Sequence, residues 1–214
     1  PFHLAVDDFG RLFVVDNDPD WRPPCRLLHV VRDGDYGYRF ALGRRGTHPF
    51  TTWFGDRPDR LGMVAGTGEA PSGIVSYRGG ALADADEGAL LVTSWGLHTI
   101  ERYRLVRQGA TFSSQAEIRI KGNEDFRPVG LAIAPDGSVV ASDWVKRSYP
   151  LHGHGRIWRF AATELPEQGD FASDWEQLNG AADRFSVTSA ADALAARGGD
   201  DRTKLKGWLA DPSI

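Results

Sequence analysis

Hydrophobic and polar residues alternate in short runs from the N-terminus to about residue 160, and glycine-rich turns separate the runs. A period of two places successive side chains on opposite faces, as in a β-strand with one buried face. The predicted strands are Leu4–Val6, Arg11–Asp16, Arg26–Val31, Pro71–Tyr77, Leu90–Ser94, Thr99–Leu105, Glu117–Lys121 and Arg156–Phe160, with a strand, turn and strand across Gly130–Trp144. In Thr99–Leu105 the alternation predicts one packed face and one face in water.

The pattern changes elsewhere in two places. The segment Ala41–Ala70 has little periodicity, and its aromatic residues argue for an ordered loop rather than a disordered one. After residue 162 the alternation stops and alanine becomes frequent. Ser189–Arg197, followed by two glycines, predicts a short helix, and Asp201–Ala210 predicts another.

The stretch Gly130–Trp144 recurs without a gap as His3–Asn17. The alignment places Leu4 on Leu131, Gly10 on Gly137 and Asp16 on Asp143. A looser copy begins at Glu87. Because Pro135-Asp136-Gly137 is typical of a tight turn, we expect a positive φ at Gly137.

Repeated β-units with a glycine before the second strand and a long loop after it are typical of a β-propeller. We therefore predict an all-β fold of four-stranded antiparallel blades, with a short helical tail. Residues 1–162 would form about three blades, and residues 163–214 a linker and helical tail or the start of a helical module. Three blades are too few to close a ring, so we expect the sequence to begin inside a larger propeller.

Charge and cysteine content exclude several classes of function. The net charge is −4 with both signs interspersed, which gives no basic surface for nucleic acid. No apolar run reaches the ~20 residues of a membrane-spanning helix. Cys25 is the single cysteine, so this segment holds no intrachain disulfide, zinc-binding Cys pair or haem-attachment motif. We expect Cys25 to pack as a partly buried small hydrophobe.

The long loops that follow the second strands carry the candidate ligand-binding residues. Asp18–Pro24 and Val145–Gly155 hold corresponding places in their units, so both should emerge at one end of the fold. Trp21 could contact a ligand or pack as a lid, His98 could face a ligand or solvent, and the tryptophans could stack on a sugar or fill the core. His152-Gly-His154 has the spacing of two metal ligands but lacks a convincing third.

Several motifs, in order, resemble the glucose/sorbosone dehydrogenase family. They are Arg32–Tyr38, Ala70–Tyr77, Leu90–Trp95 with its strand to Leu105, Ala134–Gly137 and Gly155–Arg159. Members of that family are six-bladed propellers, and the best known use pyrroloquinoline quinone (PQQ) with calcium. The chain is most similar to the propeller of large bacterial membrane-bound dehydrogenases, which also carry helical repeats and a haem c domain.

The resemblance implies that the chain is the C-terminal half of a six-bladed propeller that oxidises a sugar or alcohol with a quinone-type cofactor and passes electrons to a haem or another acceptor. It implies a periplasmic or cell-envelope location and a catalytic histidine upstream of residue 1. Arg127 is the counterpart of a family arginine at the cofactor, and Lys146, Arg147, Asp143 and His98 are predicted to bind the cofactor from their positions in the loops. The implied substrate-binding residues are Asp18, Trp21, Arg22, Trp95 and Trp144, and Asp18 and Pro19 would hold the metal.

The chain departs from the family at cofactor positions. Cys25-Arg26 stand where family members have an Asp-Glu pair, and Gly96 stands where they have a lysine that contacts the cofactor. These departures weaken the prediction of PQQ and calcium. A non-catalytic propeller that binds carbohydrate or protein is therefore the alternative, and a structural scaffold for a haem domain is a third.

Overall fold

The computed structural model describes residues 2–17, 25–37, 60–162, 173–180 and 184–210. Two compact units are present. One consists of residues 1–77, 88–132 and 140–159, and the other of residues 78–87, 133–139 and 160–214. The substrate- and metal-binding roles predicted for Asp18, Pro19, Trp21 and Arg22 concern residues outside the described ranges.

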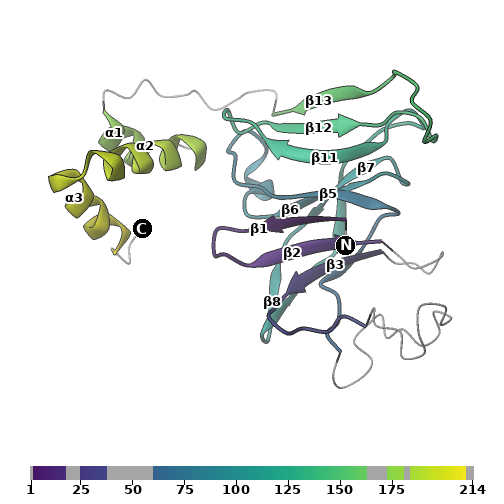
Figure 1. The fold of residues 1–214 in the computed structure, drawn as a ribbon, viewed down its shortest axis with the longest axis horizontal. Helices are drawn as coiled ribbons and strands as arrows, with labels where there is room; N and C mark the ends of the chain where they lie inside the picture. Colours follow the sequence, from purple (N-terminus) through teal and green to yellow (C-terminus); the bar gives the residue numbers. More distant parts are fainter. Residues whose placement is uncertain (1, 18–24, 38–59, 163–172, 181–183, 211–214) are drawn as a thin grey trace. The chain divides into compact units, whose positions relative to one another are not determined.

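The first sheet has four antiparallel strands in the order β1-β2-β3-β4, of which β1, β2 and β3 are labelled in Figure 1. They are β1 (His3–Val6), β2 (Leu12–Asp16), β3 (Cys25–Val30) and β4 (Ala65–Thr67). The sequence did not predict β4, because Ala65-Gly66-Thr67 has no alternating hydrophobic residues from which a strand could be recognised.

The second sheet has four antiparallel strands in the order β10-β7-β6-β5. They are β5 (Pro71–Ser76), β6 (Leu90–Ser94), β7 (Thr99–Tyr103) and β10 (Ala116–Lys121). A short 3-10 helix (Asp84–Asp86) precedes β6, and an unpredicted hairpin of β8 (Val106–Gln108) and β9 (Thr111–Ser113) lies between β7 and β10. The third sheet has the order β11-β12-β13, formed by β11 (Pro128–Ile133), β12 (Val139–Asp143) and β13 (Arg156–Phe160).

The core lies between the first two sheets. Its buried side chains include Phe13, Val15, Leu27, Ile74 and Val92. The first strands of the two sheets, β1 and β5, lie side by side, and the backbone N–H of Ile74 donates to His3 Nδ1 at 3.1 Å. Burial of these aliphatic and aromatic side chains stabilises the packing of one sheet on the next.

The prediction of one wet face on β7 was wrong. Glu101 and Arg102 are only 3% and 7% exposed. Glu101 accepts hydrogen bonds from the Tyr103 hydroxyl at 2.5 Å and from the Gly68 N–H at 3.0 Å, and Arg102 pairs with Glu117. Burial, and then the Glu101 charge, raise the pKa of Tyr103, so its hydroxyl stays protonated as the donor. Charged residues are rarely buried unless they are paired or hydrogen-bonded in this way. The charged residues of this segment therefore predicted a solvent-exposed face that the strand does not have.

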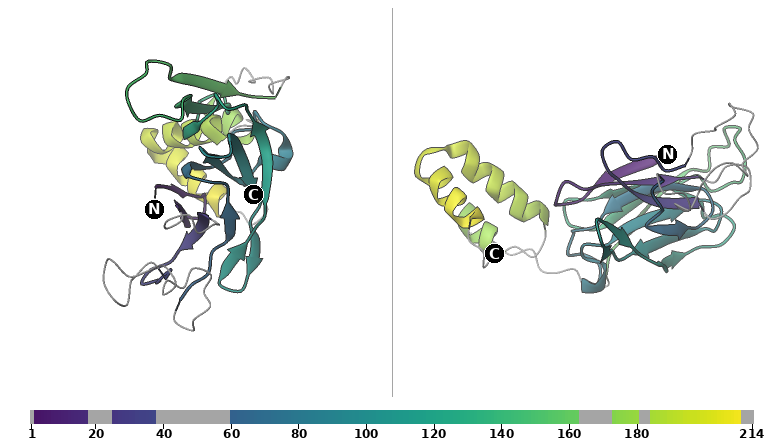
Figure 2. Two further views of the ribbon diagram at one scale, coloured as in Figure 1. Left: turned by 90° about the vertical axis from the view of Figure 1, so that its right-hand side faces the viewer. Right: turned by 90° about the horizontal axis from the view of Figure 1, so that it is seen from below.

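Three helices follow the sheets in the chain and pack together, as both views of Figure 2 show. They are α1 (Asp174–Gly180), α2 (Arg184–Arg197) and α3 (Gly199–Leu209). Leu178, Ala190, Leu194 and Leu205 form their buried centre. Helix α2 ends at Arg197 as predicted but begins earlier than Ser189, and α1 was not predicted. The short helical tail is thus confirmed.

Antiparallel four-stranded sheets confirm the predicted all-β fold class, whereas the number of blades and the domain boundaries stay predictions. Gly137 has φ +79°, as expected of its turn, and Gly10, with which it aligns in the sequence repeat, has φ +75°.

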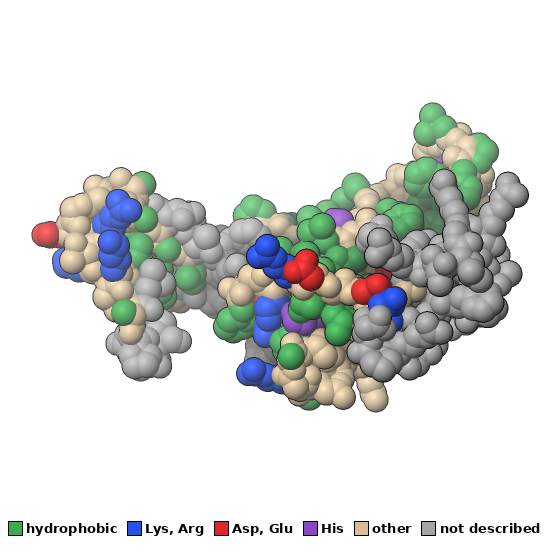
Figure 3. All heavy atoms as spheres, turned by 60° about the horizontal axis from the view of Figure 1, so that its bottom comes forward, with side chains coloured by type: hydrophobic (Ala, Val, Ile, Leu, Met, Phe, Trp, Pro, Cys, Tyr) green, Lys and Arg blue, Asp and Glu red, His purple; other side chains and the backbone are tan. Residues whose placement is uncertain are grey.

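None of the helices in the described part of the chain is long and apolar enough to cross a membrane. On the face of the sheets drawn in Figure 3, basic and acidic side chains lie interspersed among hydrophobic ones.

Candidate functional site

The candidate site lies where five connections leave the same end of the sheets. The ladders pair Cys25 with Thr67, Pro71 with Ser94, and Lys121 with Thr99. The connections β2–β3, β4–β5, β6–β7 and β10–β11 therefore emerge at one end. The β12–β13 connection joins them, because the Gly130 N–H near the start of β11 donates to Ser142 near the end of β12. For β12 and β13 this end is at the right of Figure 1.

Unusual backbone conformations concentrate in these connections. Among non-glycine residues, Ala70 has φ +53°, His98 has φ +61° and Val145 has φ +72°, and each lies in a different connection at this end. A left-handed conformation is costly for an alanine and more so for a β-branched valine. Such strain is commonly retained at functional sites, so its clustering supports a site here.

Arg127 is a buried charged side chain at this end. It is 6% exposed, its Nη1 donates to the Trp95 carbonyl at 3.1 Å, and its guanidinium carbon lies 4.6 Å from the centroid of the Trp95 ring. Its Nε is buried and, within the described residues, has no hydrogen-bond partner. Burial, and then the charge of Arg147, lower the pKa of Arg127 below its ordinary value. A buried cation with an unused donor is suited to an acceptor from a bound anion or carbonyl.

Asp143 holds Arg127 in place. Its carboxylate is fully buried; Oδ1 accepts the backbone N–H groups of Arg127 at 2.7 Å and Val145 at 2.8 Å. Oδ2 accepts from Arg156 Nε at 3.2 Å and Trp158 Nε1 at 2.8 Å. Because both oxygens are already occupied by donors, we assign Asp143 the role of positioning Arg127 and the strained turn at Val145.

A similar ion pair occurs in the first of the two aligned sequence repeats, which begins at His3. Asp16, which aligns with Asp143, pairs with Arg26 at 2.6 Å, and Asp143 pairs with Arg156 at 3.0 Å. In both repeats the arginine lies at or next to the start of the strand that follows the aspartate's strand, which is β3 for Arg26 and β13 for Arg156. Arg156 and Trp158 were missed as site residues, although the recurrence of aspartate and arginine at these places was a signal that could have identified Arg156.

The other implied cofactor-binding residues have partners or lie in solvent. His98 Nδ1 lies 2.9 Å from the Phe126 carbonyl oxygen, and Lys146 forms an ion pair with Asp125 at 2.8 Å. Arg147 is exposed. Of the implied substrate-binding tryptophans, Trp95 lies beneath Arg127, and Trp144 is 37% exposed with its Nε1 donating to the Ser148 carbonyl at 2.6 Å.

Lys146→Met should raise the pKa of Asp125. The hydrogen bond from Lys146, and then its charge, hold the pKa of Asp125 below the ordinary value. The stabilisation from this pair is therefore present above the unfolded-state pKa and is lost as the pH falls through the lower folded-state pKa. NMR titration of the Asp125 carboxyl carbon measures the shift. An unchanged Asp125 pKa in the variant would show that Lys146 is not its partner.

Cys25 and Arg26 form part of the protein interior. Cys25 is 1% exposed, so it is more deeply buried than the partly buried cysteine that was predicted. Its Sγ lies 3.2 Å from Asn17 Oδ1. Arg26 is fully buried, and besides its hydrogen bond to Asp16 it donates to the Tyr36 carbonyl at 2.6 Å.

Across the described ranges, no group of three or more His, Cys, Asp or Glu side chains is placed to hold a metal ion.

Gly96 has no space for the lysine that the family carries. A Cβ atom at this position would lie 2.5 Å from Cγ and 2.8 Å from Cβ of Glu69. The Gly96 N–H also donates to the Glu69 carbonyl at 2.9 Å. A carboxylate side chain therefore packs against the position from which the family's cation would project.

Gly96→Lys should destabilise the protein by about 1–3 kcal/mol, because the new side chain overpacks the contact with Glu69. Adding Glu69→Gly should recover part of the loss. Gly155→Lys is the control, since a Cβ there would meet only the Asp143 carbonyl oxygen at 3.8 Å. Urea denaturation measures all three proteins, and equal stability of the Gly96 and Gly155 variants would contradict the packing described.

No protein-family model and no curated protein matches this sequence. Solved structures do match. An oxidoreductase described as a glucose dehydrogenase, from Thermus thermophilus, has a TM-score of 0.54 and 18% identity over 73% of this chain and 43% of its own. The PQQ-bound aldose sugar dehydrogenase of Streptomyces coelicolor has a TM-score of 0.51 and 20% identity over 73% and 41%. Another glucose dehydrogenase has a TM-score of 0.55 and 18% identity over 76% and 45%.

The sheets and their connections thus define a propeller-type, antiparallel β-protein. This chain has the β-propeller fold of the solved glucose and aldose sugar dehydrogenases, as the resemblance in its motifs implied. It spans less than half the length of each of these solved structures.

Proposed function

We propose that this chain is part of a propeller domain that oxidises a sugar or alcohol with a quinone-type cofactor held at Arg127. The observation that carries the proposal is the buried Arg127 guanidinium, which rests over Trp95 and has an unused Nε donor. The similarity in fold to a PQQ-bound aldose sugar dehydrogenase supports the choice of cofactor.

The residues around Arg127 fit a planar, negatively charged group. Arg127 supplies a positive charge and a donor, and Trp95 fixes the plane of the guanidinium from below. When bound, a quinone supplies the acceptor for the hydride of the substrate. The contribution of Arg127 would be to stabilise the negative charge that develops on a quinone oxygen, and that of Asp143 to keep Arg127 in position.

Calcium has no comparable support in the described residues. A hard cation needs several oxygen ligands, and the implied ligands Asp18 and Pro19 lie outside the described residues. A metal is therefore not part of the proposed function. From the family resemblance we also propose a periplasmic or cell-envelope location and a haem c domain as electron acceptor.

Dye reduction by the full-length protein tests the activity. The protein is incubated with PQQ, with and without calcium, and a panel of aldoses and alcohols is supplied with a redox dye. We expect reduction that depends on PQQ and falls at least tenfold in Arg127→Gln. Arg107→Gln, an exposed arginine on β8, is the control and should retain the wild-type rate. Reduction that is absent, or equal in both variants, would contradict the proposal.

The alternative is a non-catalytic propeller that binds carbohydrate. The close contact between Gly96 and Glu69 favours it, because the family's cofactor-binding cation cannot be accommodated there without rearrangement. This alternative predicts that no dye is reduced at any concentration of PQQ, while a separate binding measurement shows that sugars bind.

A further inference from the structure

His98, in the β6–β7 connection, is bound to both ends of the β10–β11 connection, residues 122–127. Its carbonyl oxygen accepts from the backbone N–H of Gly122 at 2.9 Å, directly after β10 ends. Its ring nitrogen Nδ1 lies 2.9 Å from the carbonyl oxygen of Phe126, the residue before Arg127. One residue therefore fixes both the start and the end of the segment that leads into Arg127.

The Phe126 carbonyl determines which nitrogen of the His98 ring carries the proton. A carbonyl oxygen only accepts hydrogen bonds, so Nδ1 is the donor and in the neutral ring the proton is on Nδ1. In the protonated ring both nitrogens carry a proton, so Nδ1 remains a donor. The hydrogen bond from His98 to Phe126 is therefore possible in either charge state of the ring.

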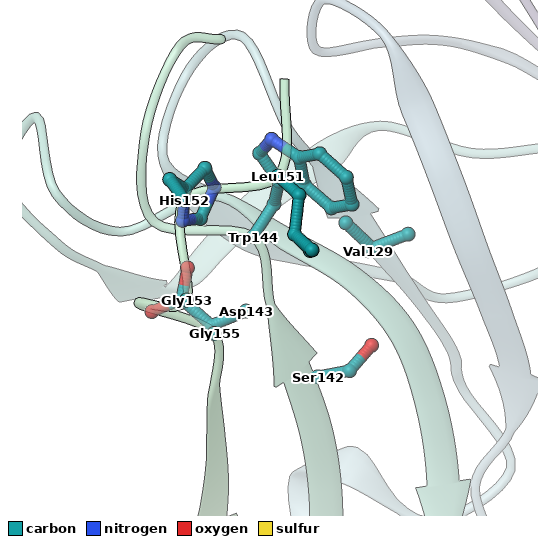
Figure 4. Close-up of a pocket in the computed structure, with 8 residues that line it drawn as sticks. All are labelled: Val129, Ser142, Asp143, Trp144, Leu151, His152, Gly153 and Gly155. Carbon is teal, nitrogen blue, oxygen red and sulfur yellow. The ribbon is translucent and has the colours of Figure 1, made fainter. Parts of the chain in front are cut away.

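The peptide group between Phe126 and Arg127 is bound on both sides. Its carbonyl oxygen accepts from His98, and its N–H donates to Asp143 Oδ1 at 2.7 Å. Asp143 lies at the end of β12, where it also lines a pocket of the third sheet (Figure 4). Because a peptide group is planar and its C=O and N–H point in opposite directions, two such bonds fix the orientation of its plane.

This peptide group precedes the Cα atom of Arg127, so its orientation sets the direction in which the Arg127 side chain starts. The side chain then returns to the β6–β7 connection, where Nη1 donates to the Trp95 carbonyl at 3.1 Å. The guanidinium lies over the Trp95 ring, and Nε is the buried donor without a partner in the described residues. The direction of that donor depends on the peptide group that His98 and Asp143 hold.

The backbone of His98 is in the left-handed region, with φ +61°. Few non-glycine residues adopt this conformation, although histidine, asparagine and aspartate do so more often than most. Backbone strain of this kind persists where the surrounding contacts hold it, and it is common at functional sites. The contacts of His98 with Gly122 and Phe126 are such contacts.

We infer that His98 is a positioning residue: its ring N–H and the Asp143 carboxylate hold the peptide group before Arg127 between them and so set the direction of the Arg127 side chain. His98 therefore acts through Arg127 and does not need to touch a ligand itself. Only the effect on a bound quinone rests on the proposed function; the effect on Arg127 does not.

Modification by phenylglyoxal, an arginine-specific reagent, tests the inference in the full-length protein without a cofactor. Arg127 is 6% exposed and should react slowly in the wild type. His98→Gly permits the positive φ but removes the donor, so we expect Arg127 to react about three- to tenfold faster, the value of one neutral hydrogen bond. Peptide mass spectrometry measures the rate. The fully buried Arg26 should stay protected.

His98→Asn should restore the slow reaction of Arg127. Asparagine also accepts a left-handed backbone, and its side-chain N–H is separated from Cβ by the same number of bonds as Nδ1 of histidine. Leu97→Ala, which changes the exposed neighbour of His98, is the control and should react like the wild type. The inference is overturned if His98→Gly reacts like the wild type, if His98→Asn reacts like His98→Gly, or if Arg26 is modified as fast as Arg127.

A double-mutant cycle on PQQ affinity separates this role from the proposed function. His98→Gly should bind PQQ about three- to tenfold more weakly than the wild type, and should cause no further loss in the Arg127→Gln background, because His98 acts through Arg127. An equal loss in both backgrounds would overturn the positioning role. Absence of PQQ binding by the wild type would refute the proposed function, while the phenylglyoxal rates would still decide the role of His98.

Discussion

Gly137→Ala is expected to destabilise the protein by about 3 kcal/mol or more, through a strained φ and a collision with the backbone. Gly137 has φ +79°, and a Cβ atom there would lie only 1.7 Å from the carbonyl oxygen of Gly79. A backbone atom cannot turn aside as the end of a side chain can. Gly137→Val should therefore cost still more. Urea denaturation of the variant and the wild type measures the difference.

Gly10→Ala is the matched control. Gly10, which aligns with Gly137 in the sequence repeat, occupies the corresponding turn with φ +75°. Nothing lies within 4 Å of the place that an added Cβ atom would take. It should cost about 1 kcal/mol, the price of the left-handed conformation alone. Equal losses in the two variants would show that the contact between Gly137 and Gly79 does not exist in solution.

Asp143→Ala is expected to cost about 3–5 kcal/mol, because it leaves buried donors without an acceptor and Arg156 without its anion. Asp143→Asn should cost less, since one amide oxygen still accepts hydrogen bonds. The loss should also release the turn at Val145 and weaken any ligand bound at Arg127. Urea denaturation gives the first effect and ligand titration the second.

Asp125→Ala is the control for Asp143. The Asp125 side chain is 53% exposed and pairs with an exposed lysine, so its removal should change stability little. If removal of Asp143 also changes stability little, its carboxylate does not hold the described donors, and the positioning role assigned to it is wrong.

The strands could be predicted where hydrophobic residues form short continuous runs, as in Leu12–Asp16 and Leu90–Ser94. The sequence pattern fails where the structure depends on pairing across the chain. Strand β4 consists of small residues and exists because Thr67 and Ala65 pair with β3. Glu101 is buried because Tyr103 and Gly68 donate to it. Tyr103 lies two residues away on the same face of β7, but Gly68 is distant in sequence, so the local pattern does not reveal the burial.

The candidate site was predictable only in part. Resemblance to the family identified Arg127, and the repeat aligned Asp143 with Asp16. That Arg127 is buried with an unused Nε, and that Asp143 is saturated, depends on strands brought together by folding. The contact that excludes a side chain at Gly96 depends on Glu69, which is distant in sequence. The roles implied for Asp18, Pro19, Trp21 and Arg22 remain predictions.

Equilibrium titration of the full-length protein with PQQ, followed by quenching of tryptophan fluorescence, tests whether Arg127 holds a quinone. We expect saturable binding by the wild type and by Arg107→Gln, and binding at least tenfold weaker in Arg127→Gln, since hydrogen bonds to charged groups contribute about 1.5–3 kcal/mol. Equal affinity in the wild type and Arg127→Gln, or no binding by the wild type, would contradict a quinone site at Arg127.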